Sequence, residues 1–367
     1  MRKTLTLKRH KAHPIAFDFK KAKGYILPLT LLGFAVLMLI YPSHYLESAK
    51  KGFALFSSSV LPAIFPFAFL SMLLSKTNII NDISRAFEKP IKFFFGVSGQ
   101  GAYVMFSSLI CGYPAGAVTT YNLYSSNVIS EDEAKSYIPF SSTASPVFIL
   151  ATVGGALFQD KQVGLVILIS HYIGTFLNGV LWRFLRSKNA NRKTFRQDDE
   201  SSIKGAINPL RTHAHTHTHL LAHTHAPVQN NNNENMVGDA VMKSVSSMLA
   251  VGGYMVLMGL VVDTLHLLPF YGNLPSVLKS ILSGLIEMSR GVAEARAVDS
   301  KWLAVALATF SVTFGGVSVN LQNYHYFSKC NCSFFDVILP KFSQGILAFF
   351  CAIFFSIIIF NNFGIKG

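Results

Sequence analysis

The sequence predicts an all-α, polytopic membrane protein, and three observations lead to that fold class. Hydrophobic residues make up 51% of the 367-residue chain and charged residues only 14%, with a mean hydropathy of +0.40. The apolar residues gather in long uncharged runs, separated by short segments rich in Lys and Arg. Several runs are interrupted by Gly and Pro, which weaken or break helices. Together these features exclude an ordinary soluble domain and favour helices that cross a bilayer, some of them broken.

The formal charge of +14 would suggest nucleic-acid binding in a soluble chain. Here the Lys and Arg residues flank apolar runs, where they orient a membrane protein, so we expect a lipid bilayer and no nucleic acid as partner. The cysteines form neither a disulfide framework nor a zinc motif, and we interpret them as reduced. We expect no cofactor and no structural metal, and the sequence does not indicate an oligomeric state. The four cysteines are Cys111, Cys330, Cys332 and Cys351.

The first segment, residues 1–23, is strongly basic and is predicted to stay in the cytoplasm. The uncharged run Tyr25–Tyr41 is followed by no small-residue cleavage site, so we expect an uncleaved first span rather than a signal peptide. The next run, Phe53–Leu74, contains Pro62 and Pro66. Two prolines four residues apart predict a kink or a short unwound stretch.

Segment 76–92 is basic and amphipathic, which is typical of a helix lying in the membrane interface. The following stretch, Phe93–Ser130, contains no Asp, Glu, Lys or Arg and is organised around Gly112-Tyr113-Pro114. Broken backbone is tolerated in hydrocarbon only where protein or a water-filled cavity receives it. We therefore predict a broken helix or the tip of a re-entrant hairpin that lines a polar path. The alternative is a kinked helix whose glycines only allow close packing.

A second broken element is predicted further along the chain. Ser130 and Glu133 form a capping box, so a helix should begin there. The uncharged run Ser136–Gln159 then places small polar residues at membrane depth ahead of Pro146. Gln162–Trp182 is a cleaner span, with His171 as its only ionisable group and no evident catalytic partner for it. The candidate site residues of the second broken element are Ser141, Ser142, Thr143 and Ser145.

Charge counting supports a re-entrant element. If the amino terminus is inside and the first two runs cross, segment 76–92 is inside, as its basic character requires. Three further crossings would then place the basic residues that follow Trp182 outside, against the positive-inside rule. One of the two interrupted elements should therefore enter and leave the membrane on the same side.

Residues 187–236 are polar and lack an apolar period, so we predict a disordered cytoplasmic linker. It divides the membrane part into a first half, 24–186, and a second half, 237–367. Its alternating histidines could bind zinc or nickel, or could be a low-complexity expansion in a tolerant loop. These histidines are His213, His215, His217, His219, His223 and His225.

The second half repeats features of the first. Ser246-Ser247-Met248-Leu249 resembles Ser58-Ser59-Val60-Leu61, and Phe310-Ser311 precedes Gly316 as Phe106-Ser107 precedes Gly112. Two halves with similar broken helices predict duplicated, transporter-like repeats that meet around a site near the membrane midplane. Chance similarity between apolar sequences is the alternative. The expected site residues in the second break are Gly315, Gly316 and Ser318.

Glu287 is the main single-residue candidate in the second half. It is surrounded by Leu285, Ile286 and Met288, and a carboxylate there is costly unless it pairs or faces water. We expect it to contact a substrate or a coupling proton or cation. The alternative is an interfacial helix in which Glu287 and Arg290 form a solvated pair. The last run, Phe342–Phe360, is predicted to be a plain span.

Five segments, in this order, resemble a known family: SVLPAIFPFAFL, GQGAYVMFSSLICGYPAGA, FSSTASPVFILATVGGALF, GLIEMSRG and FGGVSVNLQ. They are similar to sporulation integral membrane proteins of the YlbJ (SpoVV) type, in the Gate, or nucleoside-recognition, superfamily of membrane domains. The resemblance covers about residues 50–186 and 237–360. It implies a fold similar to concentrative nucleoside transporters and passage of dipicolinate across a forespore membrane. Ser142-Thr143-Ala144 departs from an Asn-rich pattern in the family, which puts an amide contact there in doubt.

Three classes of function stay open. A secondary transporter for a small organic anion or a nucleoside-like solute is favoured by the broken helices and by the absence of a GxxxxGK[ST] loop. Hydroxyls and helix amino termini suit a dianion, whereas Glu287 suits a coupling proton or cation. A non-transporting assembly protein of the forespore membrane would also fit the resemblance. An enzyme is not expected, because no HExxH motif or paired aspartates occur in the spans.

Overall fold

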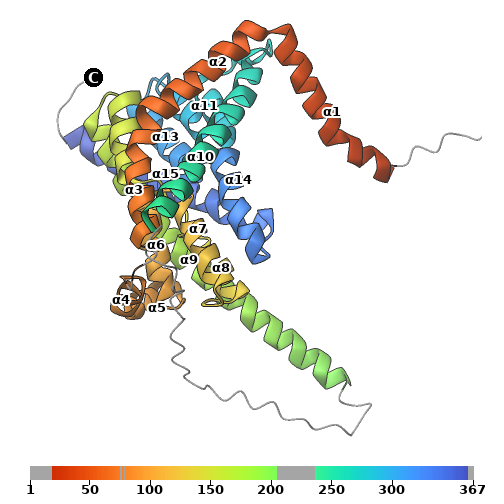
Figure 1. Ribbon diagram of the computed structural model, residues 1–367, viewed down its shortest axis with the longest axis vertical. Helices are drawn as coiled ribbons and strands as arrows, with labels where there is room; N and C mark the ends of the chain where they lie inside the picture. The colour runs from red at the N-terminus through yellow and green to blue at the C-terminus, as the bar shows by residue number, and fades with distance from the viewer. Residues whose placement is uncertain (1–18, 75–76, 78, 205–235, 363–367) are drawn as a thin grey trace, which may run out of the picture. The chain divides into compact units, whose positions relative to one another are not determined.

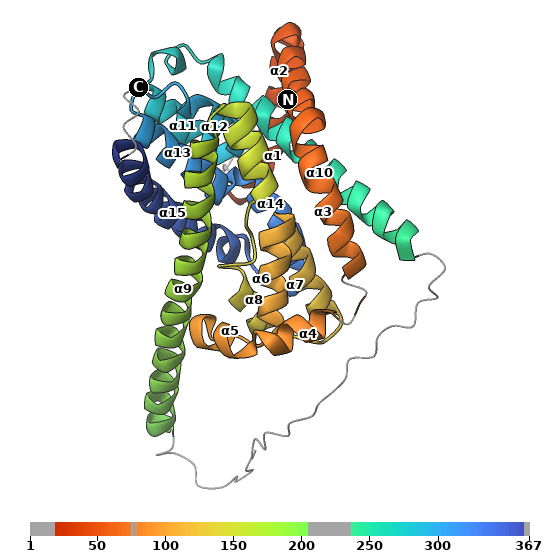
Figure 2. The same ribbon diagram turned by 90° about the vertical axis from the view of Figure 1, so that its left-hand side faces the viewer.

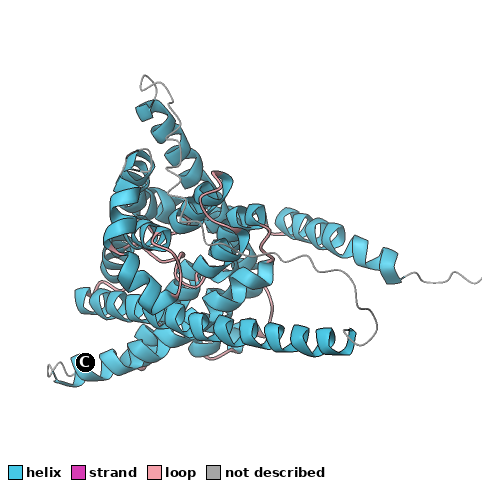
Figure 3. Cartoon of the chain, turned by 90° about the horizontal axis from the view of Figure 1, so that it is seen from below, coloured by secondary structure: helices cyan, strands magenta, loops and turns pink. Residues whose placement is uncertain are grey.

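The computed structural model describes residues 19–74, 77, 79–204 and 236–362, and in these ranges the chain is helical without a strand (Figures 1 and 3). This confirms the all-α prediction. Two compact units separate at residue 47, Met1–Glu47 and Ser48–Gly367. Residues 1–18 and the histidine tract lie outside the described residues. The cytoplasmic location of the first segment and metal binding by the histidines therefore stay predictions.

The first unit contains α1 (Phe19–Ile40) and the start of α2 (Pro42–Leu55). The apolar part of α1, Tyr25–Ile40, is shorter than the helices that qualify as full spans. Its large apolar side chains, such as Leu27 and Leu39, are exposed. Such a surface is suited to lipid or to another helix rather than to water.

Among the described residues, five helices are long and apolar enough to cross a membrane. The first, Pro42–Leu74, joins α2, a π-helical turn η1 (Phe56–Val60) and α3 (Leu61–Leu74). The predicted irregularity near Pro62 is thus a widened turn just before it, and Pro66 lies inside α3 without breaking it. The other four spans are Lys161–Ser187, Val237–His266, Lys301–Cys330 and Phe334–Phe360.

The uncharged stretch after segment 76–92 forms a hairpin. Two short helices, α4 (Ile79–Ala86) and α5 (Glu88–Phe95), precede α6 (Gln100–Cys111), which bends 87° away from α5. After Gly112-Tyr113-Pro114 the chain returns as α7 (Ala115–Ser125), beside α6 (Figure 2). The chain therefore breaks and turns back at Gly112-Tyr113-Pro114, as predicted, whereas a re-entrant course through a membrane stays a prediction.

The second broken element also matches its prediction. The Ser130 hydroxyl accepts a hydrogen bond from the Glu133 N–H, 3.2 Å away, and α8 (Glu131–Tyr137) begins there. Residues 141–145 are non-helical, and the chain continues as a π-helical segment η2 (Phe148–Leu157). The long helix α9 (Lys161–Lys204) follows. It extends through the first part of the predicted disordered linker, because the charged residues there are good helix formers.

The second half begins with α10 (Met236–His266) and η4 (Tyr271–Asn273). The interfacial helix that was the alternative around Glu287 is not formed as one continuous helix. The chain instead forms a second hairpin, α11 (Ser276–Ile286) and α12 (Met288–Ala295), which turns at Glu287. The remaining elements are α13 (Lys301–Phe314), α14 (Gly316–Phe327), η5 (Ser328–Cys330) and α15 (Phe334–Asn362).

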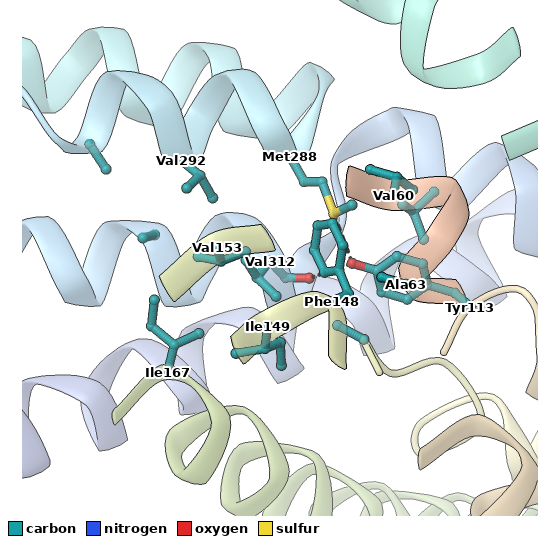
Figure 4. Packing of buried hydrophobic residues seen from close by; sticks show 14 of the residues in the cluster. Val60, Ala63, Tyr113, Phe148, Ile149, Val153, Ile167, Met288, Val292 and Val312 are labelled. Atoms are coloured by element: carbon teal, nitrogen blue, oxygen red, sulfur yellow. Dashed lines mark hydrogen bonds between the residues drawn. The ribbon is translucent and has the colours of Figure 1, made fainter. Parts of the chain in front are cut away.

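The two halves of the larger unit share one apolar core. Val60, Phe148 and Ile167 from the first half pack in the same cluster as Val292 and Val312 from the second (Figure 4). In Figure 2 the hairpin α6–α7 enters this core from the end where α4, α5 and the start of α10 lie. The hairpin α11–α12 enters from the opposite end. Sequence duplication itself stays a prediction.

We predict that α5 and the start of α10 face the same side of the membrane. In a background with its four native cysteines replaced by Ala, Lys89→Cys and Asp239→Cys should react with an impermeant maleimide from one side. Lys161→Cys and Asn273→Cys should react from the other side. Labelling of Lys89→Cys and Asp239→Cys from opposite sides would remove the re-entrant topology.

Asp160 joins the start of α9 to α13. Its carboxylate accepts hydrogen bonds from the N–H groups of Gln162 (2.8 Å) and Val163 (3.3 Å) and lies 3.0 Å from the Lys301 ammonium. Partial burial raises the pKa of this carboxyl, but Lys301 and the two amides outweigh it and lower the pKa from its ordinary value. A helix cap is worth about 0.5–2 kcal/mol, and a half-exposed ion pair adds little.

We therefore expect Asp160→Ala to cost about 1–2 kcal/mol of stability, mostly from the lost cap. Because the pKa is lower in the folded state, this contribution is present above the ordinary carboxyl pKa and is lost as the pH falls through the folded value. Thermal unfolding of detergent-solubilised protein at several pH values measures it. Asp299→Ala, which removes an exposed carboxylate at the same end, is the matched control.

Candidate functional site

The tip of the first hairpin is set by Gly112. Its φ of +80° is in the left-handed region, which favours glycine. Behind the tip, the hydroxyls of Ser107 on α6 and Thr119 on α7 lie 3.0 Å apart and join the two arms. The predicted residues Gly112, Tyr113 and Pro114 are all buried. The tip is therefore a built structure inside the protein and not a surface loop.

The non-helical segment 141–145 packs directly on this hairpin. The space beside Gly116 is filled by the Ser141 carbonyl oxygen, 1.8 Å from where a Cβ would lie, and a Cβ at Gly112 would lie 3.0 Å from the Ser145 nitrogen. The Ser108 hydroxyl accepts from the Thr143 N–H and lies 2.9 Å from the Thr143 hydroxyl. All four predicted site residues of this segment are buried, and Ser141, Thr143 and Ser145 lie against the first hairpin, whereas Ser142 binds Asn323 of α14.

His171 supports the same segment from α9. Its Nε2 accepts the Ala144 N–H at 3.0 Å, so its Nδ1 carries the proton and donates to the Thr313 hydroxyl 2.9 Å away on α13. These partners were not predictable from local patterns, because they lie far from His171 in the chain. The ring fixes one peptide group of the broken segment to the second half of the chain.

The second hairpin turns at Glu287, as closely packed as the first. The backbones of Gly284 and Gly291 approach so closely that a Cβ on Gly291 would lie 2.3 Å from the Gly284 Cα. The Glu287 carboxylate is only 1% exposed and caps α12, accepting from the Arg290 N–H at 2.9 Å and from the Ser289 hydroxyl. These two buried hydrogen bonds hold the carboxylate at the tip.

The solvated Glu287–Arg290 pair that the spacing allowed is not formed. The Arg290 guanidinium lies 2.8 Å from the Asp263 carboxylate of α10, and only the backbone N–H of Arg290 contacts Glu287. The reason is that Glu287 is in extended conformation, with φ −139° and ψ 123°, and ends α11, so the two side chains do not share a helical face. Glu287 thus caps α12 at the tip, and the direct ion pair of Arg290 is made with Asp263 instead.

The third break, Gly315-Gly316, lies within a continuing span and is not a hairpin, unlike the first break that it was expected to mirror. Both glycines have positive φ, and a Cβ on Gly316 would lie 2.7 Å from the Ile286 carbonyl oxygen of the second hairpin. Asn320 binds the freed Phe314 and Gly316 carbonyls at 3.0 and 2.7 Å. Ser318 is buried nearby on α14.

Tyr113 connects the two hairpin tips. Its hydroxyl lies 2.8 Å from the Met288 sulfur, next to Glu287, and donates to the Val312 carbonyl at 3.2 Å. Tyr113 and Met288 point toward one another in Figure 4. Tyr113 of the first half thus meets the second hairpin in one buried region, and a common site of two repeats stays a prediction.

Lys341 is the functional candidate that sequence reasoning missed. It lies within α15, one residue before the run taken as a plain span, and is fully buried. Its ammonium donates to the Ser142 carbonyl and to the Gln344 side chain, both at 2.9 Å, and lies 6.0 Å from the centre of the Tyr113 ring. No carboxylate partner of Lys341 is found among the described residues. Its position just outside the counted uncharged run was the only available signal.

A cavity lies against the first tip. It is lined by Gly112, Tyr113, Pro114 and neighbouring residues of α3, α7 and α10. A larger cleft of about 520 Å³ adjoins it and shares Pro114 and Asn122 with it. Three or more His, Cys, Asp or Glu side chains do not gather at a metal-binding distance anywhere in the described ranges, and Cys111, Cys330, Cys332 and Cys351 form no disulfide there.

We predict that Gly116→Ala separates the first hairpin from segment 141–145. A methyl group there meets a carbonyl oxygen of the main chain, which no rotamer change relieves, so we expect a loss of about 2 kcal/mol or more, seen as a lower melting temperature. Gly253→Ala is the matched control, because open space surrounds that position in α10 and Ala is the better helix former. Equal melting temperatures for Gly116→Ala and wild type would contradict the close contact.

Comparison with known proteins gives one curated relative. The chain is 27% identical over 324 residues to the sporulation integral membrane protein YlbJ of Bacillus subtilis, a match that covers 84% of this chain and 76% of that protein. No protein-family model and no solved structure matches the chain. The Gate superfamily therefore stays a prediction. The similarity to this relative, itself named an integral membrane protein, confirms the resemblance predicted from the five motifs.

Proposed function

We propose that this chain is a sporulation-associated transporter that carries a small organic anion, with dipicolinate the first solute to test, across a forespore membrane. The observation that carries the proposal is the meeting of two hairpin tips, from opposite ends of the helical bundle, at Tyr113 and Met288. Broken helices that meet inside a bundle are the usual architecture of transporter sites. The sporulation role rests on the relative's name.

The preference for an anion rests on Lys341. A fully buried ammonium without a carboxylate partner is expensive in a membrane, and such groups usually mark the path of a substrate or ion. Its two hydrogen bonds go to neutral oxygens, at Ser142 and Gln344, so positive charge remains to attract an anion. The adjacent hydroxyls of segment 141–145 and the Tyr113 ring suit an aromatic carboxylate.

Glu287 has the opposite role in this proposal. A carboxylate at the second tip repels an anionic solute, so it takes up a proton or a cation that travels with the solute. The capping bonds from Ser289 and Arg290 hold it in place without neutralising its charge through an ion pair. The solute charge is thus assigned to Lys341 of α15, near the first tip, and the coupling charge to Glu287 at the second tip.

The test is flux in proteoliposomes loaded with dipicolinate, read by the luminescence of external terbium. We expect Lys341→Met and Glu287→Gln each to reduce flux about tenfold or more, since a charge-assisted contact is worth about 1.5–3 kcal/mol. Gly112→Leu and Pro114→Ala should also reduce it by altering the tip. Glu88→Gln and Lys89→Met, exposed on α5, are the matched controls.

Two results would contradict parts of this proposal. Correctly inserted wild-type protein without flux of any tested anion would favour the assembly-protein alternative. Wild-type flux by Glu287→Gln across the pH range would remove Glu287 from coupling and leave it as a helix cap.

A further inference from the structure

The cleft of about 520 Å³ that adjoins the first tip has a distinctive lining, and none of the site residues considered so far except Pro114 belongs to it. It lies between α7, α10 and α14. Its size is within the range of small-molecule sites. Ala240 and Lys243 come from the first turns of α10, so the cleft opens toward the end of the bundle at which α10 begins.

Three tyrosines, one from each helix, provide the flat surfaces of this tyrosine cleft: Tyr121, Tyr254 and Tyr326. The rings of Tyr121 and Tyr326 have their centres 6.4 Å apart and are inclined at 45°. Aromatic faces and edges bind another ring better than they bind an aliphatic chain. The lining thus favours a planar, aromatic ligand.

The charge of the lining is positive. Lys243 and His325 line the cleft, whereas Asp and Glu are absent from its described lining. Lys329, just outside it, lies 5.1 and 5.5 Å from the ring centres of Tyr121 and Tyr326. A cleft with one lysine in its described lining, a second lysine beside it and no acid in that lining concentrates anions.

Gln322 supplies an independent sign of a missing ligand. Its side chain lines the cleft and is 95% buried by neighbouring groups, being only 5% exposed, yet its Oε1 has no hydrogen-bond partner. The unpartnered Oε1 can only accept a hydrogen bond, whereas the Nε2 of the same amide is a donor. A carboxylate or ring nitrogen in the cleft would accept from Nε2, and a protonated group of the ligand would donate to Oε1.

We infer that the tyrosine cleft is the access site in which a planar aromatic carboxylate is held before it reaches the hairpin tip. The ring lies among the three tyrosines, with its carboxylate at Lys243 and a polar edge at Gln322. Pro114 and Asn122 border both the cleft and the inner cavity, so the path onward leads to Tyr113. Access from this side rests on the proposed transport, whereas binding in the cleft does not.

The test is equilibrium binding to the purified full-length protein in detergent, measured by calorimetry with pyridine-2,6-dicarboxylate. Lys243→Met and Tyr254→Leu should each weaken binding about tenfold, and Lys243→Arg should restore most of it, because it keeps the charge. Lys161→Met, an exposed lysine at the opposite end, is the matched control and should bind as wild type does. Cyclohexane-1,3-dicarboxylate, with the same charges and no aromatic ring, should bind at least tenfold more weakly.

Unchanged affinity in Lys243→Met, or equal affinity for the non-aromatic diacid, would overturn the inference. Loss of the calorimetric binding signal of pyridine-2,6-dicarboxylate when phosphatidylglycerol is added to the micelles would assign the cleft to lipid. That result would overturn the inference as well. The flux measurement tests the proposed function separately from binding in the cleft. If Lys243→Met binds the probe as wild type does and wild-type protein shows flux, the cleft proposal is wrong and the transport proposal stands. If the variants bind as expected but wild-type protein shows no flux, the cleft proposal stands and the transport proposal is wrong.

Discussion

A helix broken inside a bilayer leaves peptide groups that water does not reach, and binding those groups is the constraint on which the rest of this structure depends. In segment 141–145 the Thr143 N–H is bound by Ser108, and the Ala144 N–H by His171. The Ser142 carbonyl is bound by Lys341. Each donor or acceptor comes from a different helix, so the broken segment determines how α6, α9 and α15 pack around it.

The same constraint explains why polar side chains are so numerous in an apolar bundle. His171, Lys341 and Asn320 would each be costly in hydrocarbon if they stood alone, but each binds backbone that a break has released. Lys341, which we propose attracts the solute, therefore also has a structural role. A loss of flux on substitution is informative only beside a measurement of folding, which is why charge-removing variants of similar size are more useful than truncations.

Local patterns predicted local structure well. Gly112-Tyr113-Pro114 indicated the hairpin tip, Ser130 and Glu133 the start of α8, and Pro146 the unwound segment before it. What depended on distant helices was not predictable. Spacing along one helix suggested a Glu287–Arg290 pair, but the chain turns at Glu287 and Asp263 of α10 takes the guanidinium. Lys341 was missed because a charge at the edge of an apolar run normally marks the membrane surface, whereas α15 begins seven residues earlier, at Phe334.

The contact between the two tips limits how the site can move. The Tyr113 hydroxyl binds both the Met288 sulfur of the second hairpin and the Val312 carbonyl of α13, just before the Gly315 break. A displacement of either hairpin that admits a solute must break or carry along this hydroxyl, which also lies on the ring facing Lys341. This contact therefore couples the tip that adjoins the inner cavity to the tip that holds Glu287. In a transporter, this is the linkage by which occupation of one charged group by solute would alter the exposure of the other to a proton or cation.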